Sequence, residues 1–158
     1  MVMRRTTLSA IAIATSLVLA SPAHSDPVLE AYAGYWSGLG TVVMSSGTTE
    51  QVKCVAVYRV AGEQLRQNLR CASASYSING SAEVAVKGNQ VSGSWEEKTY
   101  SAVGKINGRM VGDGMSLKIE SPNFGASMVI SLAGCKQAIA IQPEGLDVSR
   151  ISIAIAKY

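Results

Sequence analysis

Histidine is the commonest general base and metal ligand in proteins, and this 158-residue chain contains one, His24. His24 falls in a segment that we expect to be removed, so the exported chain would contain no histidine. Ser-His-Asp and Cys-His catalysis and histidine-ligated zinc are then excluded. The chain also lacks a CxxC pair, a P-loop and a G-x-S-x-G motif. These features predict a protein that is not an enzyme and has no catalytic residues, no metal site and no cofactor.

Charged residues form two further groupings. Glu96 and Glu97 are adjacent. Because consecutive residues of a strand point to opposite faces, this pair cannot act as acid and base on one substrate. Four basic residues lie close together on one predicted hairpin, namely Lys53, Arg59, Arg66 and Arg70. We interpret them as a solvated outer surface, and a patch for an anionic partner or a lipid headgroup is the alternative.

Composition and charge indicate one globular domain that does not bind nucleic acid. Hydrophobic residues make up 47% of the chain and charged residues 16%, which is far from disordered or collagen-like compositions. Of the 14 basic residues, Arg4 and Arg5 belong to the segment expected to be removed, so the formal charge falls from +3 to +1. Electrostatic binding of nucleic acid needs a clustered basic face, and this charge balance excludes it.

Residues 1–25 have the three parts of a secretory signal peptide: a basic start, an apolar run over 8–20, and small residues before Asp26. The apolar run is too short to cross a bilayer, so we expect no transmembrane segment. We predict cleavage after Ser25, a periplasmic or secreted location, and a single β-barrel domain over 26–158.

The rest of the chain has the period-two alternation of β-strands after a short helical turn near 27–32. Ten candidate strands cover 34–44, 49–60, 65–77, 82–87, 90–98, 101–111, 115–121, 126–133, 136–142 and 148–157. Their short connections leave no room for crossover helices. This pattern predicts an all-β fold, an antiparallel up-and-down meander of eight to ten strands closed into a barrel. A two-sheet sandwich is the alternative.

Four two-residue turns are predicted from pairs that tolerate positive φ: Gly62-Glu63, Asn79-Gly80, Gly88-Asn89 and Asp113-Gly114. The first turn pairs Ala61 with Gln64, and in that register Cys54 lies opposite Cys71 at a non-hydrogen-bonded pair, where side chains approach most closely. In an oxidising compartment we predict a Cys54–Cys71 disulfide, and two reduced, buried cysteines are the alternative. Cys135 is expected to be inert and buried on the inner face.

The alternation places aromatic, methionine and glutamine side chains inside the barrel. Apolar cavities with one or two polar anchors are typical ligand sites. The candidate ligand-binding residues are Trp36, Tyr58, Gln67, Trp95, Met110 and Met128. Gln137 is a second candidate anchor, and a barrel filled by its own side chains is the alternative.

The segment Gly34-Tyr35-Trp36 resembles the G-x-W signature of lipocalins and other calycins, among them avidins, fatty-acid-binding proteins and small periplasmic metalloprotease inhibitors. Its extension through Gly38 and Gly40 is similar to the opening of nitrobindin-like ten-stranded barrels. The resemblance implies a lipocalin-like barrel in which Trp36 closes one end against a late basic residue, here Arg150. The histidine that ligates haem in nitrobindin-like barrels has no counterpart. As a whole, the chain is similar to small exported proteins of alphaproteobacteria.

Three functions fit these expectations. The first is a periplasmic barrel that binds a small apolar ligand. The second is a protein-binding module, such as a protease inhibitor, that acts on an envelope protein through its loops or a flexible segment at 26–32. The third is a structural protein of the cell envelope without a ligand. An internal void on the order of several hundred Å3 would favour the first function.

Overall fold

The computed structural model describes residues 20–21 and 26–158. Apart from Ala20 and Ser21, the signal peptide predicted over 1–25 lies outside the described residues. One short helix, α1 (Pro27–Glu30), precedes ten strands. The strands are β1 (Gly34–Met44), β2 (Thr49–Ala61), β3 (Gln64–Ala72), β4 (Ser77–Lys87), β5 (Gln90–Glu97), β6 (Ala102–Val111), β7 (Gly114–Glu120), β8 (Gly125–Ala133), β9 (Lys136–Glu144) and β10 (Val148–Lys157).

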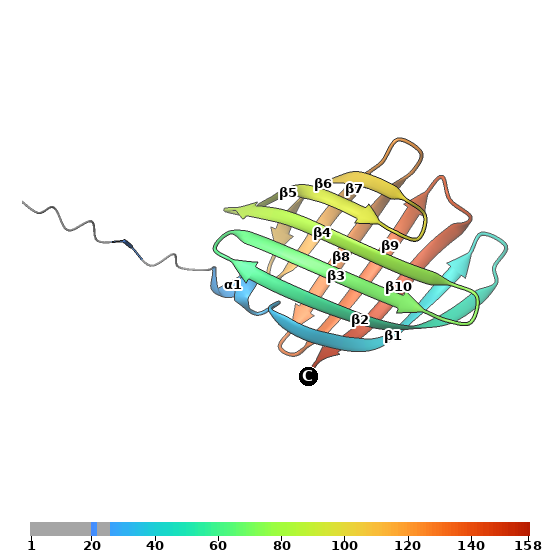
Figure 1. Ribbon diagram of the computed structural model, residues 1–158, viewed down its shortest axis with the longest axis horizontal. Coiled ribbons are helices and arrows are strands. Elements are labelled where there is room, and N and C mark those ends of the chain that lie inside the picture. Colours follow the sequence, from blue (N-terminus) through green and yellow to red (C-terminus); the bar gives the residue numbers. More distant parts are fainter. Residues whose placement is uncertain (1–19, 22–25) are drawn as a thin grey trace, which may run out of the picture.

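Each strand pairs antiparallel with the next, and β10 pairs with β1, so the sheet closes into a barrel (Figure 1). The predicted all-β meander of eight to ten strands is confirmed, and the number is ten. Closure gives every strand two hydrogen-bonded neighbours, so the barrel exposes no sheet edge. Within the described residues, no helix has the length and apolar character needed to cross a membrane.

The predicted alternation sorts side chains between the interior and the outer surface. On β10, Ile151, Ile153 and Ile155 are buried, whereas Arg150 and Ser152, on the alternate positions, are exposed. The basic residues of β2 and β3 also point outward, and Arg66 forms an exposed ion pair with Glu83 of β4. These charges therefore belong to a solvated outer surface.

Several glycines lie where neighbouring strands approach too closely for a side chain. A Cβ at Gly38 would lie 2.0 Å from the carbonyl oxygen of Ala154, and a Cβ at Gly93 would lie 1.9 Å from that of Glu83. Only glycine fits at such approaches, which accompany the strong bending that a closed barrel requires.

Three of the four predicted turns lie at or next to the expected position. Gly62-Glu63 and Gly88-Asn89 connect their strands as predicted. The turn predicted at Asp113-Gly114 lies one residue earlier, at Gly112-Asp113, and Gly114 already belongs to β7. Gly112 has a φ of +58°, so it takes the left-handed position that glycine favours.

The turn predicted at Asn79-Gly80 is wrong, because both residues lie inside β4. The chain turns instead at 73–76, where the Ser73 hydroxyl accepts a hydrogen bond from the Tyr76 N–H at 3.0 Å. Serine hydroxyls stabilise turns in this way without glycine. Gly80 faces the barrel interior, where a Cβ would lie 3.8 Å from the Trp95 indole nitrogen.

Helix α1 covers one end of the barrel (Figure 1). Asp26 caps the helix by accepting a hydrogen bond from the Val28 N–H at 2.9 Å, and Pro27 takes the first helical position. Leu29 and Tyr32 are fully buried. The segment 26–32, predicted to be a flexible arm, is therefore a plug, and we call this end of the barrel the closed end. The opposite end, formed by the loops at 45–48, 73–76, 98–101, 121–124 and 145–147, is the open end.

The predicted disulfide joins Cys54 and Cys71, which are directly paired across β2 and β3 with a Cα–Cα distance of 4.1 Å. Both residues are buried inside the barrel. Cys135 is free but exposed, which corrects the prediction of inert burial. It lies in the tight turn between β8 and β9, where the strand alternation that suggested an inward side chain no longer applies.

One thiol should react in the unreduced protein, and it should be Cys135. Replacing both Cys54 and Cys71 by Ala removes a cross-link between residues 17 apart in sequence and should lower the free energy of unfolding by about 3 kcal/mol. Thiol titration and urea unfolding measure the two effects, with Cys135→Ser as the control that leaves stability unchanged. Three reactive thiols in the unreduced protein would contradict the pairing.

Candidate functional site

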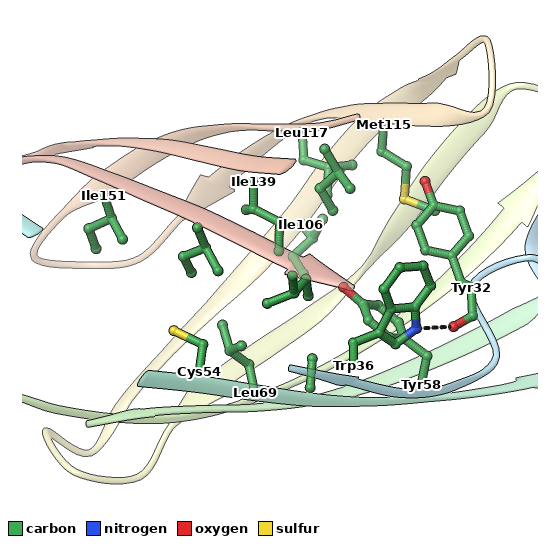
Figure 2. Packing of buried hydrophobic residues seen from close by; sticks show 14 of the residues in the cluster. Tyr32, Trp36, Cys54, Tyr58, Leu69, Ile106, Met115, Leu117, Ile139 and Ile151 are labelled. Carbon is green, nitrogen blue, oxygen red and sulfur yellow. Dashed lines mark hydrogen bonds between the residues drawn. The ribbon is translucent and has the colours of Figure 1, made fainter. Parts of the chain in front are cut away.

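The closed end is sealed by a hydrogen-bonded aromatic cluster (Figure 2). The Trp36 indole Nε1 donates to the Tyr32 carbonyl oxygen at 2.8 Å, and the Tyr32 hydroxyl donates to the Asp113 carbonyl oxygen at 2.7 Å. Trp36 is 0% exposed. Burial, with a smaller contribution from Asp113, raises the pKa of Tyr32 to about 12, so the hydroxyl stays protonated and can donate. Trp36 is thus part of the seal.

The basic residue that faces Trp36 is Lys157. Its Nζ lies 5.1 Å from the centre of the indole ring and donates to the Ala31 carbonyl oxygen at 2.8 Å. Arg150, which the calycin resemblance offered for this role, is exposed near the start of β10 at the opposite end of the strand. The expected contact between tryptophan and a late basic residue therefore exists, but the assignment to Arg150 is wrong.

Tyr58 separates this seal from the space beyond it. Its ring lies 5.7 Å from that of Tyr32 and 6.3 Å from that of Trp36, measured between centroids. Its hydroxyl accepts from Gln67 Nε2 at 2.7 Å and donates to Gln137 Oε1 at 2.6 Å. Gln137 is 3% exposed, and its Nε2 has no hydrogen-bond partner among the described residues. Burial raises the pKa of Tyr58, which therefore stays neutral.

A cavity of about 330 Å3 extends from Tyr58 towards the open end of the barrel. Its wall is almost wholly apolar and includes Leu69, Ile106 and Leu117. The two charged side chains that line it are Glu97 and Asp147, and no lysine, arginine or histidine of the described residues does so. The cavity therefore has a neutral polar floor, apolar walls and an acidic mouth.

Aromatic side chains gather with Glu97 at this mouth. Trp95 and Phe124 pack edge to face with ring centroids 5.5 Å apart. Tyr76 and Tyr100 also line the cavity, from two different loops of the open end. Burial raises the pKa of Tyr76, and Tyr100 and Glu97 add to this rise.

Glu97 is a buried carboxylate held by the backbone. It is 6% exposed, its Oε1 accepts from the Asn79 N–H at 2.7 Å, and its Oε2 accepts from the Tyr100 N–H at 2.7 Å. Burial acts to raise the pKa of Glu97, but the hydrogen bonds from Asn79, Tyr100 and Thr99 together outweigh it, so the pKa lies below its ordinary value. Glu97 is therefore ionised at neutral pH.

Glu96 is on the other side of the sheet, as the strand alternation predicts. Its Oε1 accepts from the Ser81 hydroxyl at 3.0 Å and lies 3.9 Å from Lys98 Nζ on the outer surface. The two carboxylates are thus separated by the sheet and cannot act as an acid and base pair.

Four of the six predicted ligand-binding residues line the cavity: Tyr58, Gln67, Trp95 and Met128. Trp36 lies in the seal, and Met110 packs on the core near the closed end, so neither reaches this space. Glu97 was not among the predicted site residues, although it shares the inward parity of Trp95. The aromatic side chains of the mouth were not predicted either. Tyr100 and Phe124 lie in loops, which period-two alternation does not describe, and Tyr76 lies in a loop that was predicted to be part of the strand 65–77.

No protein-family model matches the chain, and no curated protein matches its sequence. Two solved structures have a similar fold. The crystal structure of Rv2717c from M. tuberculosis matches with a TM-score of 0.63 and 11% identity, over 85% of this chain and 99% of that one. The S-type phycobiliprotein lyase CPES from Guillardia theta matches with a TM-score of 0.60 and 13% identity, over 82% of this chain and 90% of that one.

These likenesses and the closed ten-stranded barrel fit a calycin-like or lipocalin-like barrel. At identities this low they concern the fold alone, because one fold hosts many functions. The likeness to exported alphaproteobacterial proteins stays a prediction.

The stabilising effect of the Glu97 carboxylate should depend on pH. Its pKa is lowered in the folded protein, so its contribution is complete above the unfolded-state pKa of about 4.3 and is lost as the pH falls through the folded-state pKa. Glu97→Gln should lower the free energy of unfolding by about 2 kcal/mol at neutral pH, because a backbone N–H loses its acceptor. The difference should shrink below about pH 4.

Urea unfolding at a series of pH values measures this difference. Glu96→Gln is the matched control, because it removes the neighbouring carboxylate from the exposed face. It should change stability by less than about 0.5 kcal/mol. A constant difference between wild type and Glu97→Gln down to strongly acid pH would contradict the assignment.

Proposed function

We propose that the protein is a non-enzymatic, periplasmic barrel that binds a small apolar molecule in its cavity. The observation that carries the proposal is the cavity of about 330 Å3, closed at one end and lined by apolar side chains. Volumes of about 300–1,000 Å3 with a few placed polar groups are typical of ligand sites. Gln67 and Tyr58 supply hydrogen-bonding groups at the floor.

The chemistry of the lining supports binding over catalysis. Both oxygens of Glu97 accept backbone hydrogen bonds, which leaves the carboxylate poorly placed to exchange a proton. Tyr58 has a raised pKa and is held between two glutamines. One neighbour in fold is named a phycobiliprotein lyase. We give that name little weight for this chain, because the likeness is one of fold.

The two other functions considered have less support. A protease-inhibitor-like module acting through a flexible N-terminal segment is disfavoured, since Leu29 and Tyr32 anchor that segment to the closed end. A structural envelope protein needs no internal space, and a barrel evolved only for its outer surface gains stability by filling its interior. Neither function makes use of the cavity.

Export through the predicted signal peptide is part of the proposal. The Cys54–Cys71 bond supports it, because disulfides persist in oxidising compartments such as the periplasm and are rare in the cytosol.

Filling the cavity should abolish binding without unfolding the barrel. Ala82 lines the cavity on β4, and Ala82→Leu places a larger apolar side chain within it. Affinity for an apolar fluorescent probe should fall at least about tenfold, or 1.4 kcal/mol. The midpoint of urea unfolding should be retained or rise, because an empty space is filled. Probe titration and unfolding of the same samples measure both effects.

Ala85→Leu is the matched control, since Ala85 lies on the same strand three residues on and faces outward. It should leave probe affinity unchanged. Gly93 is unsuitable for filling, because any Cβ there meets the β4 backbone. If Ala82→Leu destabilises the barrel by about 1–3 kcal/mol, as overpacking does, and the wild type binds no probe, the interior is filled and the proposal is wrong.

A further inference from the structure

We infer that the mouth of the cavity takes an ammonium head group, so that the ligand is a cationic amphiphile with an apolar tail. The inference rests on the proposed function and narrows the class of ligand. It is carried by three features of the open end: an ionised, buried carboxylate, aromatic faces around it, and the absence of basic residues from the lining of the described cavity.

The first feature is the unbalanced charge of Glu97. It is 6% exposed and lines the cavity, and no salt bridge within the described residues involves it. The nearest lysine in sequence, Lys98, lies outside against Glu96. The backbone hydrogen bonds that Glu97 accepts stabilise its carboxylate but supply no positive charge. The negative charge of Glu97 therefore has no counter-charge in the protein and is available to attract a cation at the mouth.

The second feature is the aromatic surround. Trp95, Tyr76, Tyr100 and Phe124 all line the same cavity as Glu97. Aromatic faces attract cations through the negative potential over the ring, most strongly when the site is partly desolvated. Several aromatic rings beside a carboxylate form the kind of surround that recognises alkylated ammonium groups.

The third feature is the sign of the remaining charge. Asp147 is the other charged side chain that lines the cavity, and Glu50 lies near Tyr76, where hydrogen bonds from Ser73 and Ser75 lower its pKa. A fatty acid would bring its carboxylate against this acidic mouth without an arginine or lysine to pair with it. The same apolar tail with a cationic head would meet complementary charge.

Three probes with one tail and different heads test the inference: decyltrimethylammonium, decanol and decanoate. Each is titrated below its micelle concentration into the purified wild-type protein, and binding is followed by tryptophan fluorescence and calorimetry. We expect decyltrimethylammonium to bind about tenfold more tightly than decanol, and decanoate to bind more weakly than both.

Glu97→Gln should lower the affinity for decyltrimethylammonium about tenfold. The affinity of the same variant for decanol should stay within about twofold of the wild-type value. The matched control Glu96→Gln should change neither. Tyr100→Leu is a second variant, since the side chain is 62% exposed and its backbone N–H is unaffected. It should weaken binding of the cation selectively.

The outcomes separate the two proposals. Three results would each overturn the cationic ligand and leave the apolar cavity in place. The first is equal affinity for the three probes, and the second is tighter binding of decanoate than of decyltrimethylammonium. The third is an equal loss of affinity for all three probes in both Glu97→Gln and Tyr100→Leu. No binding of any probe overturns both. If Glu97→Gln fails to fold, a loss of affinity in Tyr100→Leu for decyltrimethylammonium but not for decanol still supports the inference. If Tyr100→Leu shows no such selective loss, the inference is overturned.

Discussion

Pairing of β1 with β10 is the constraint on which the rest of the molecule depends. It closes the ten strands into a ring, so that every strand has two hydrogen-bonded neighbours and the sheet encloses an interior. An eight-stranded barrel has an interior that side chains just fill, and barrel diameter grows with strand number. A ten-stranded ring therefore encloses more space than its inward side chains occupy, unless something else fills it.

The chain fills only one end of this space. Helix α1 brings Leu29 and Tyr32 over the closed end, and Trp36 is fixed there by its hydrogen bond to Tyr32 and by Lys157 above its ring. Among residues 20–21 and 26–158, nothing comparable covers the open end, where Tyr76 and Tyr100 extend from loops. The cavity follows from this asymmetry, and so does its polarity, with neutral hydrogen-bonding groups at the floor and carboxylates at the mouth.

Sequence patterns predicted the parts of this structure that depend on local periodicity. The strand alternation correctly divided inside from outside, and one glycine-containing turn fixed the register that joins Cys54 to Cys71. Turn positions were less predictable. Asn79-Gly80 has turn chemistry but serves as a strand segment facing Trp95, because the side chain of Ser73 closes the actual turn. Cys135 was misplaced because alternation stops in a turn.

The functional features were harder to predict, since they depend on contacts between distant strands and loops. Lys157, not Arg150, meets Trp36 because β10 pairs antiparallel with β1, which sets Lys157 opposite Trp36 and Arg150 opposite Val43 at the other end of the strand. Glu97 resembles any strand glutamate until its partners from β4 and the next loop are known. Whether the interior contains a cavity depends on the summed volume of all inward side chains relative to the volume that the closed ring encloses. No local sequence pattern contains this information.

Native mass spectrometry of the protein, isolated without denaturation from its own cells and again after incubation with a total lipid extract, tests the central claim most directly. An occupied cavity predicts one small apolar molecule bound per chain, which leaves when the barrel is unfolded. A chain that carries no bound molecule in either sample would contradict the claim that the barrel holds a ligand.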